Sequence, residues 1–368
     1  MNLESLFNNI HWWICMMLMF SLILTYNIIP KIIWVVNEKE LIDHPDNRSS
    51  HALATPTMAG VAFFLTLMIS QFFLHYWDTD DVGSNLIASI TIIFAIALKD
   101  DLVLATPLAK LMGEMVAVSF ILVHPSLAIN SFDGFLGIEA MPFGLNYIFA
   151  GLMLLTIVNA YNLIDGVDGL AASVGIVILL IYGLIFYHLQ MYFYVLFCTS
   201  LIGILIAFLR YNFSHRKKIF MGDTGSLIIG FCIGFLSLKF LHINAEDLTV
   251  FSFLPENEII ILAAILFVPL FDMFRVMGIR ILNKKSPFFP DRNHIHHILL
   301  DKGFSHVKVA LIISIVNCWI VLLFVYLSSL FTSVEMLGML AMFFILMLVI
   351  FNKLRKDNIK MGRTIPRI

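Results

Sequence analysis

The sequence predicts an all-α, polytopic integral membrane protein, built as a helical bundle of about 10 or 11 transmembrane helices. Of its 368 residues, 60% are hydrophobic and only 13% are charged, whereas about a quarter of residues are charged in soluble domains. The mean hydropathy is +0.93. The apolar residues also form runs long enough to cross about 30 Å of hydrocarbon as helices. We therefore expect a single membrane-embedded domain over residues 1–368.

Apolar segments follow one another along the whole chain, and each is expected to form a membrane-spanning helix. In chain order they are residues 12–36, 57–77, 85–99, 108–124, 145–160, 169–188, 192–210, 224–242, 259–282, 307–328 and 334–352. The segments at 85–99 and 145–160 are short and polar at one end. They can therefore be tilted or continue into the neighbouring loops.

The basic residues predict the orientation, because positive charge is retained on the cytoplasmic side of a membrane. Lys and Arg gather in the loops after the first, seventh and ninth segments and in the C-terminal tail. The loops on the opposite side, at 78–84, 125–144, 243–258 and 329–333, contain neither residue type. Lys239, near the outer end of its segment, is the exception. We expect the N-terminus outside and the C-terminus in the cytoplasm.

Polar motifs interrupt these apolar segments, and all of them fall on the predicted cytoplasmic side. A charge at membrane depth costs about 2.5–3.5 kcal/mol even on lenient scales, so such groups are functional candidates. Carboxylates and amides on one side suit a hard cation such as Mg²⁺, which uses one or two carboxylates together with substrate phosphates. The motifs are Asp100 with Asp101, residues 159–168, residues 221–226, Asp272 and residues 290–297.

Each polar motif also has a structural interpretation. Asp223 with Thr224 could cap the helix that follows, since Asp and Thr accept from free N–H groups at helix starts. Asn159 and Asn162 could link helices through side-chain hydrogen bonds. Lys110 could extend its ammonium to the membrane surface.

The last motif and the segment before it leave two further alternatives open. His294, His296 and His297 resemble a metal-binding tract by composition, but the sequence lacks the second ligand pair of a structural zinc site. Asp272 and Arg275 are three residues apart on one predicted helix. They could form an internal ion pair or act in the site.

Taken together and in this order, the motifs resemble those of the bacterial polyprenyl-phosphate N-acetylhexosamine-1-phosphate transferases, a glycosyltransferase 4 type family. The resemblance runs from Asp43 to the end of the His-rich loop. It is stronger to the undecaprenyl-phosphate N-acetylglucosaminyl-1-phosphate transferase branch than to the branch using UDP-N-acetylmuramoyl-pentapeptide, because of the pattern at 290–297. The motifs that carry it are Asp100, Asp101 and Lys110, residues 159–170, residues 221–226 and residues 290–297.

The resemblance implies transfer of N-acetylhexosamine 1-phosphate, foremost N-acetylglucosamine 1-phosphate, from a UDP-sugar to undecaprenyl phosphate in the inner leaflet. UMP is released, and the lipid-diphosphosugar formed starts cell-envelope polysaccharide assembly. It also implies Mg²⁺ as cofactor, with Mn²⁺ as the alternative, and a multi-pass protein of the bacterial inner membrane surrounded by lipid. No nucleic acid partner is expected, and a homodimer is left open.

The resemblance further implies three groups of site residues. Catalytic roles are expected for Asp100, Asp101, Asp165, Asp168 and His296. Substrate binding is expected for Lys110, Asn159, Arg292, His294 and His297. Mg²⁺ is expected on Asp223 and Asn162.

Two other functions compete with this interpretation. An ion-coupled transporter would also bury carboxylates, but nearer the midplane, on interrupted helices within repeated halves; here they lie at the inner ends of segments. The second is a UDP-N-acetylmuramoyl-pentapeptide phosphotransferase of the same family, and a comparison of donors would decide it.

Overall fold

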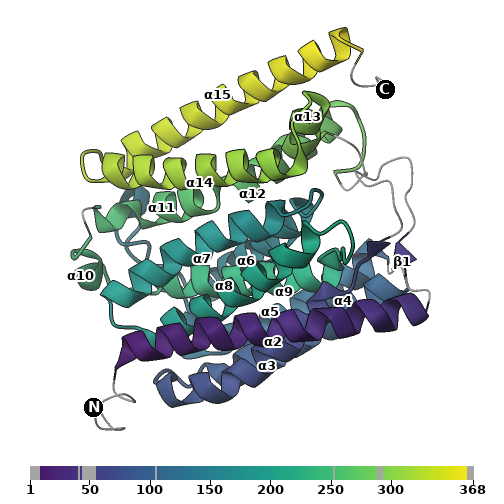
Figure 1. Cartoon of the computed structure of the whole chain (residues 1–368). Coiled ribbons are helices and arrows are strands. Elements are labelled where there is room, and N and C mark those ends of the chain that lie inside the picture. Colours follow the sequence, from purple (N-terminus) through teal and green to yellow (C-terminus); the bar gives the residue numbers. More distant parts are fainter. Residues whose placement is uncertain are drawn as a thin grey trace.

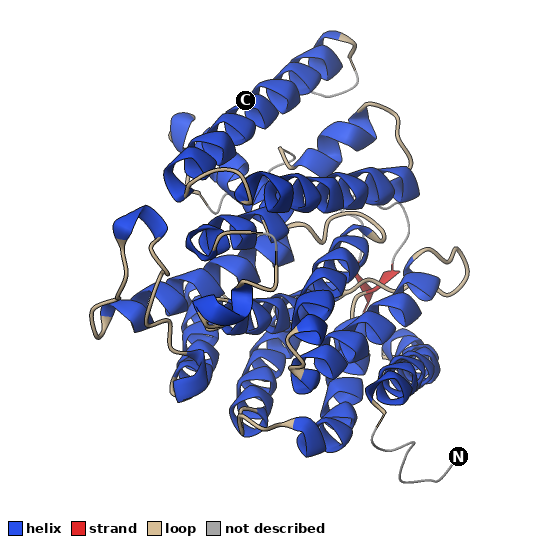
Figure 2. Cartoon of the chain, turned by 90° about the vertical axis from the view of Figure 1, so that its left-hand side faces the viewer, coloured by secondary structure: helices blue, strands red, loops and turns tan. Residues whose placement is uncertain are grey.

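The computed structural model describes residues 9–39, 42–43, 55–103, 106–251, 253–287 and 293–362. Within these ranges the chain is almost entirely helical (Figures 1 and 2). The α-helices are α2 (Ile10–Glu38), α3 (Ala59–Leu74), α4 (Gly83–Leu102), α5 (Pro107–Leu122), α6 (Leu145–Leu163), α7 (Leu170–His188), α8 (Tyr192–Asn212), α9 (Gly222–Phe240), α10 (Ala245–Leu248), α11 (Glu258–Ile265), α12 (Phe267–Leu282), α13 (Ile295–Asp301), α14 (His306–Ser328) and α15 (Ser333–Lys360). The short strands β1 (Ile42–Asp43) and β2 (Thr55–Pro56) pair antiparallel.

The predicted membrane segments all coincide with helices of the structure. In the described part of the chain, eight helices are long and apolar enough to cross a membrane, and the bent pair α11–α12 makes a ninth. The two remaining segments are α4, which carries Lys99, Asp100 and Asp101 near its end, and α5, which has 16 residues. The prediction of a polytopic helical membrane protein is confirmed. Which end of the bundle faces the cytoplasm stays a prediction.

The helices run alongside one another, so the bundle has two ends (Figure 1). The β1–β2 pair lies at one end and α10 at the other. Helix α9 forms the centre, packed by α3, α4, α6 and α7 and almost wholly buried. Helix α15 lies at the edge and exposes apolar side chains along one face, as a helix facing lipid does.

A close approach of backbones fixes where α9 begins. A Cβ on Gly60 would lie 2.2 Å from the backbone nitrogen of Gly225, so only glycine lets α3 come this near to α9. Just before α9, the N–H of Phe220 donates to the carbonyl of Pro56 at 2.7 Å, and the N–H of Ala59 donates to the carbonyl of Phe220 at 3.2 Å. These contacts hold the first turn of α9 beside β2.

The bend of 69° between α11 and α12 is stabilised by one buried side chain. Asn317 of α14 donates to the carbonyl of Ile265 at 3.2 Å and accepts from the N–H of Val268 at 3.3 Å. It thereby pairs a backbone carbonyl and a backbone N–H on the two sides of the break between α11 and α12. After the bend, α12 leads toward α13 at the β1–β2 end (Figure 1).

Candidate active site

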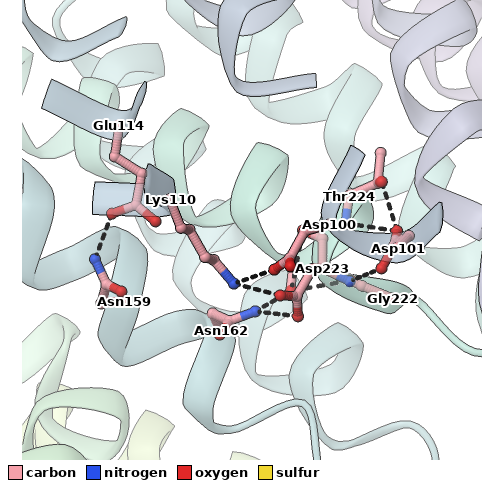
Figure 3. Close-up of polar contacts among 10 residues, drawn as sticks. Asp100, Asp101, Lys110, Glu114, Asn159, Asn162, Gly222, Asp223 and Thr224 are labelled. Atoms are coloured by element: carbon pink, nitrogen blue, oxygen red, sulfur yellow. Dashed lines mark hydrogen bonds and ion pairs between the residues drawn. The ribbon is translucent and has the colours of Figure 1, made fainter. Parts of the chain in front are cut away.

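Helix ends at the β1–β2 end of the bundle bring together five of the predicted site residues (Figure 3). Asp223 lies in the first turn of α9, and Asp100 and Asp101 lie in the last turn of α4. Lys110 comes from the first turn of α5, and Asn162 from the last turn of α6. Residues far apart in the sequence therefore form one polar cluster where the ends of α4, α5, α6 and α9 meet.

Asp101 caps α9. Its carboxylate accepts from the N–H of Asp223 at 2.9 Å, and from the N–H and the hydroxyl of Thr224 at 3.0 and 2.5 Å. No side chain of α9 itself caps the helix. The interpretation of Asp223 and Thr224 as the cap is therefore wrong: a carboxylate from α4 satisfies these donors, and Asp223 is left to face the cluster.

Lys110 joins the carboxylates of two other helices. Its ammonium contacts the carboxylate of Asp223 and lies 3.4 Å from Oδ2 of Asp100. The interpretation that Lys110 only extends to the membrane surface is wrong, because its Nζ points into the cluster (Figure 3). The carboxylates of Asp100 and Asp223 therefore converge on the position that the Lys110 ammonium occupies.

The two asparagines of α6 both link helices, as the structural interpretation predicts. Asn162 donates to Oδ1 of Asp223 at 3.0 Å and to the hydroxyl of Ser226 at 2.7 Å. Asn159 donates to Oε2 of Glu114 at 2.6 Å and also to a carbonyl of its own helix. These bonds tie α6 to α9 and to α5, while the expected roles of Asn162 toward metal and of Asn159 toward substrate stay predictions.

The donor set at Asp223 suits a hard divalent ion that arrives with phosphates. The described residues hold no cluster of three or more His, Cys, Asp or Glu side chains arranged to bind a metal. Asp100 and Asp223 alone supply two converging carboxylates, which is the number Mg²⁺ typically takes from a protein when substrate phosphates complete its shell. The residues present therefore fit Mg²⁺ shared with a phosphorylated substrate.

Asp168 links the loop that joins α6 and α7 to two other parts of the chain. Its Oδ2 lies 2.7 Å from the ammonium of Lys218 and 2.9 Å from Nδ1 of His306 at the start of α14. Burial disfavours the charged carboxylate, but the hydrogen bonds from His306 and Lys218 outweigh it and hold the pKa of Asp168 below its ordinary value. Asp168 is thus an ionised anchor at the rim of the cluster.

Asp165 has the opposite electrostatics, although it lies in the same loop. Burial raises its pKa to about 8, and the negative charges of Asp223, Asp101 and Asp168 add to this shift. A carboxyl group with this pKa can hold or release a proton near neutral pH. Asp165 therefore has the electrostatics expected of a group that exchanges protons or responds to an arriving cation.

The His-rich loop is held by α12. Buried Asp272 accepts from Nδ1 of His294 at 2.8 Å and from the N–H of Ile295 at 2.9 Å. Arg275, one turn further along α12, donates to the carbonyl of Asn293 at 2.5 Å. Both residues thus bind the segment where α13 begins, which supports a structural role, while a role in the site stays a prediction.

His296 reaches the loop between α6 and α7. A Cβ on Gly166 would lie 2.4 Å from Nε2 of His296, so this ring lies directly against the glycine. The ring of His296 also stacks on His294 at 5.4 Å, and His297 lies 4.4 Å from it, centroid to centroid. All three histidines are buried. Arg292, expected to bind substrate, lies outside the described residues.

Four residues of this region were not singled out from the sequence as site residues: Glu114, Lys218, His306 and Asn212. Glu114 follows Lys110 by one helical turn, a spacing that places both side chains on one face of α5. Asn212 is buried, accepts from the N–H of Gly169 at 2.5 Å and donates to the carbonyl of Ile219 at 2.9 Å. Nothing in the local sequence marks His306, since its partner is set only by the packing of α14.

Comparison with known proteins places this sequence in a family. The family model for glycosyl transferase family 4 matches residues 84–241, which include the five clustered residues. A probable undecaprenyl-phosphate N-acetylglucosaminyl 1-phosphate transferase of Bacillus subtilis is 31% identical over 311 residues, covering 84% of this chain and 82% of the relative. A decaprenyl-phosphate N-acetylglucosaminephosphotransferase of Mycobacterium leprae is 30% identical, with 76% and 75% covered.

A third relative is also named as an N-acetylglucosaminyl 1-phosphate transferase. The undecaprenyl-phosphate alpha-N-acetylglucosaminyl 1-phosphate transferase of Yersinia pestis is 27% identical over 281 residues, with 75% of this chain and 73% of the relative covered. The similarity thus spans most of this chain and most of each relative. This chain belongs to glycosyl transferase family 4, in the group of the polyprenyl-phosphate N-acetylglucosamine-1-phosphate transferases.

Proposed function

We propose that this protein transfers N-acetylglucosamine 1-phosphate from UDP-N-acetylglucosamine to undecaprenyl phosphate and releases UMP. The observation that carries the proposal is the cluster of Asp100, Lys110 and Asp223 at one end of a membrane bundle. Carboxylates that face a cation are what a reaction between two phosphate groups needs, because metal and basic side chains offset the repulsion between the reacting anions. The names of the similar proteins agree with it.

In the proposed reaction, an oxygen of the lipid phosphate attacks the β-phosphorus of the donor. The bond from this phosphorus to the bridging oxygen breaks, and the electron pair leaves with UMP. Asp100 faces the acceptor phosphate and orients it, while the ammonium of Lys110 offsets the charge of the phosphates. Mg²⁺, when held by Asp223 and Asn162, supplies further positive charge at the phosphates.

The surroundings of the cluster suit an acceptor with a lipid tail. Leu102 at the end of α4 and Leu108 and Leu111 in α5 are 45%, 68% and 38% exposed. They flank Asp100 and Lys110 in the sequence, so apolar surface adjoins the charged groups. An acceptor phosphate could approach from the lipid while its tail stays in hydrocarbon, with the donor arriving from the cytoplasm at the same end of the bundle.

The remaining site residues support this chemistry from the donor side. Asp165, with its raised pKa, and the anchored Asp168 lie where a nucleotide or the shell of a metal ion could be held. Asp272 of α12 binds His294 and the N–H of Ile295, where α13 begins. His296 and His297 lie in the first turn of α13, and His296 touches Gly166. We assign these histidines to the diphosphate or the sugar of the donor.

The experiment that tests the proposal is UMP release by purified protein with undecaprenyl phosphate and Mg²⁺. Three donors are compared: UDP-N-acetylglucosamine, its 4-epimer and UDP-N-acetylmuramoyl-pentapeptide. The proposal expects turnover with UDP-N-acetylglucosamine that requires both lipid and metal. Preference for the pentapeptide donor would move the protein to the other branch of the family. No UMP from any donor, together with substrate uptake into vesicles, would replace the transferase with a transporter.

A further inference from the structure

A buried carboxylate beside the cluster has no part in the proposed chemistry. Glu114 in α5 is 1% exposed. Its Oε2 accepts from Asn159 at 2.6 Å, but its Oε1 is buried without a hydrogen-bond partner among the described residues. An unsatisfied buried carboxylate oxygen is costly, so its retention calls for an explanation.

The position of Glu114 points to Lys110 as its second partner. The two residues are four apart on α5, a spacing at which side chains are neighbours on a helix surface. Figure 3 shows the free oxygen of Glu114 on the side toward Lys110. The flexible four-carbon stem of lysine lets the ammonium move between Asp223 and Glu114 without a change in the backbone.

A divalent cation at Asp223 would make this movement necessary. The Lys110 ammonium already contacts Asp223, the carboxylate assigned to the metal, so the ammonium and a metal ion compete for it. Two positive charges that contact the same carboxylate repel each other strongly where water is largely excluded. The displaced ammonium needs an anion nearby, and Glu114 offers one on the same helix.

We propose that Glu114 is a positioning residue that receives the Lys110 ammonium when a divalent cation binds Asp223. The inference rests on the proposed metal-dependent transfer and deepens it. With Lys110 on Glu114, the ammonium stays within the site and remains available to donor or acceptor phosphates. The pair therefore acts as a two-position countercharge, at Asp223 before the cation binds and at Glu114 afterwards.

The test is a double-mutant cycle read by Mn²⁺ binding to the full-length protein in detergent, without substrate, followed by the EPR signal of free Mn²⁺. Lys110→Met should tighten Mn²⁺ binding on the order of tenfold, because the competitor is removed. Glu114→Gln should weaken binding on the order of tenfold, because the displaced ammonium has no acceptor. In the double variant, Glu114→Gln should have no further effect on the Lys110→Met protein.

Three results would overturn the inference. If Glu114→Gln weakens Mn²⁺ binding equally with and without Lys110, Glu114 only attracts the metal through its charge. If it changes binding in neither background, or if none of the four proteins binds Mn²⁺, the two-position lysine does not exist. Glu258→Gln is the matched control, since Glu258 is another buried glutamate, 3% exposed, with an unpaired oxygen in the described structure, and it should leave Mn²⁺ affinity unchanged.

A second variant guards against misfolding. Glu114→Asp keeps the charge and withdraws it by one methylene, so it should give an affinity between those of the wild type and Glu114→Gln. The failure of this inference is distinct from failure of the proposed function. If the wild type releases UMP but Glu114→Gln has the same effect on Mn²⁺ affinity with and without Lys110, only the role of Glu114 is refuted. If Glu114→Gln weakens Mn²⁺ binding only when Lys110 is present but no UMP is released, only the transferase is refuted.

Discussion

Removing the Asp101 carboxylate should destabilise the protein and displace Asp223 at the same time. In Asp101→Ala, α9 loses its cap, which is typically worth about 1 kcal/mol, and a favourable charge at the helix N-terminus, worth about 0.3–1 kcal/mol. Thr224 is fully buried, so its N–H would be left without a partner, at about 1–3 kcal/mol. These contributions overlap, and we expect a loss of about 2–4 kcal/mol in the free energy of unfolding.

The loss of stability should come with a loss of turnover. The N–H of Asp223 is bound directly to Asp101, so the first turn of α9 would shift when the cap is removed. A displacement of about 1 Å in a catalytic group can lower the rate by about a hundredfold. Asp101→Asn keeps one acceptor oxygen and should fall between the wild type and Asp101→Ala in both properties.

The assay pairs thermal unfolding in detergent, followed by intrinsic fluorescence, with UMP release. Asp100→Asn is the matched control, because Asp100 is adjacent in sequence and lies 3.4 Å from Lys110. It should lower turnover strongly with a smaller effect on the melting temperature. The reasoning is refuted if Asp101→Ala melts at the wild-type temperature while turnover is lost, since Asp101 would then act in the chemistry alone.

Three other substitutions give separate tests. Asp223→Asn should lower turnover by about 10³-fold or more and leave the protein folded. Normal Mg²⁺-dependent activity of this variant would contradict the assignment of Mg²⁺ to Asp223. Gly166→Ala places a Cβ 2.4 Å from Nε2 of His296 and should lower turnover at least about tenfold, whereas Gly183→Ala, with its nearest contact at 3.6 Å, should be neutral in the same assay. The pKa of Asp165 is raised to about 8 in the folded protein, so the folded state binds more protons than the unfolded state between pH of about 4 and about 8. The contribution of Asp165 to stability should therefore be lost as pH rises through that window. Asp165→Asn should flatten the dependence of the melting temperature on pH, measured in a buffer with a chelator. Equal slopes of melting temperature against pH for the wild type and Asp165→Asn would show that another group titrates.

The fold could be predicted because hydrocarbon leaves the chain few choices. In the described structure, helices and the short strands β1 and β2 account for the regular structure, and each predicted apolar segment became a helix or a bent pair of helices. The bend at Ile265 was not foreseen, because it depends on Asn317 of another helix. A polar residue within an apolar segment signals a partner, but the segment alone does not say which backbone groups it will bind.

The grouping of the site residues could be predicted for a similar reason: polar side chains at one set of helix ends meet at one face of a bundle. The division of roles within the group could not. Asp100 and Asp101 are identical neighbours in the sequence, and only the rotation of α4 against α9 turns one toward Lys110 and the other toward Thr224. The pairing of Glu114 with Asn159 likewise follows from the contact of α5 with α6, which no local pattern encodes.

The most direct test of the proposed transfer follows the two phosphorus atoms of UDP-N-acetylglucosamine during one turnover with undecaprenyl phosphate and Mg²⁺. Label at the β-position should move into the extracted lipid together with the sugar, and label at the α-position should be recovered in UMP. Asp223→Asn should abolish both transfers. Recovery of both labels in UDP, with the sugar alone on the lipid, would contradict the proposed reaction, because the diphosphate bond would then not be the one that breaks.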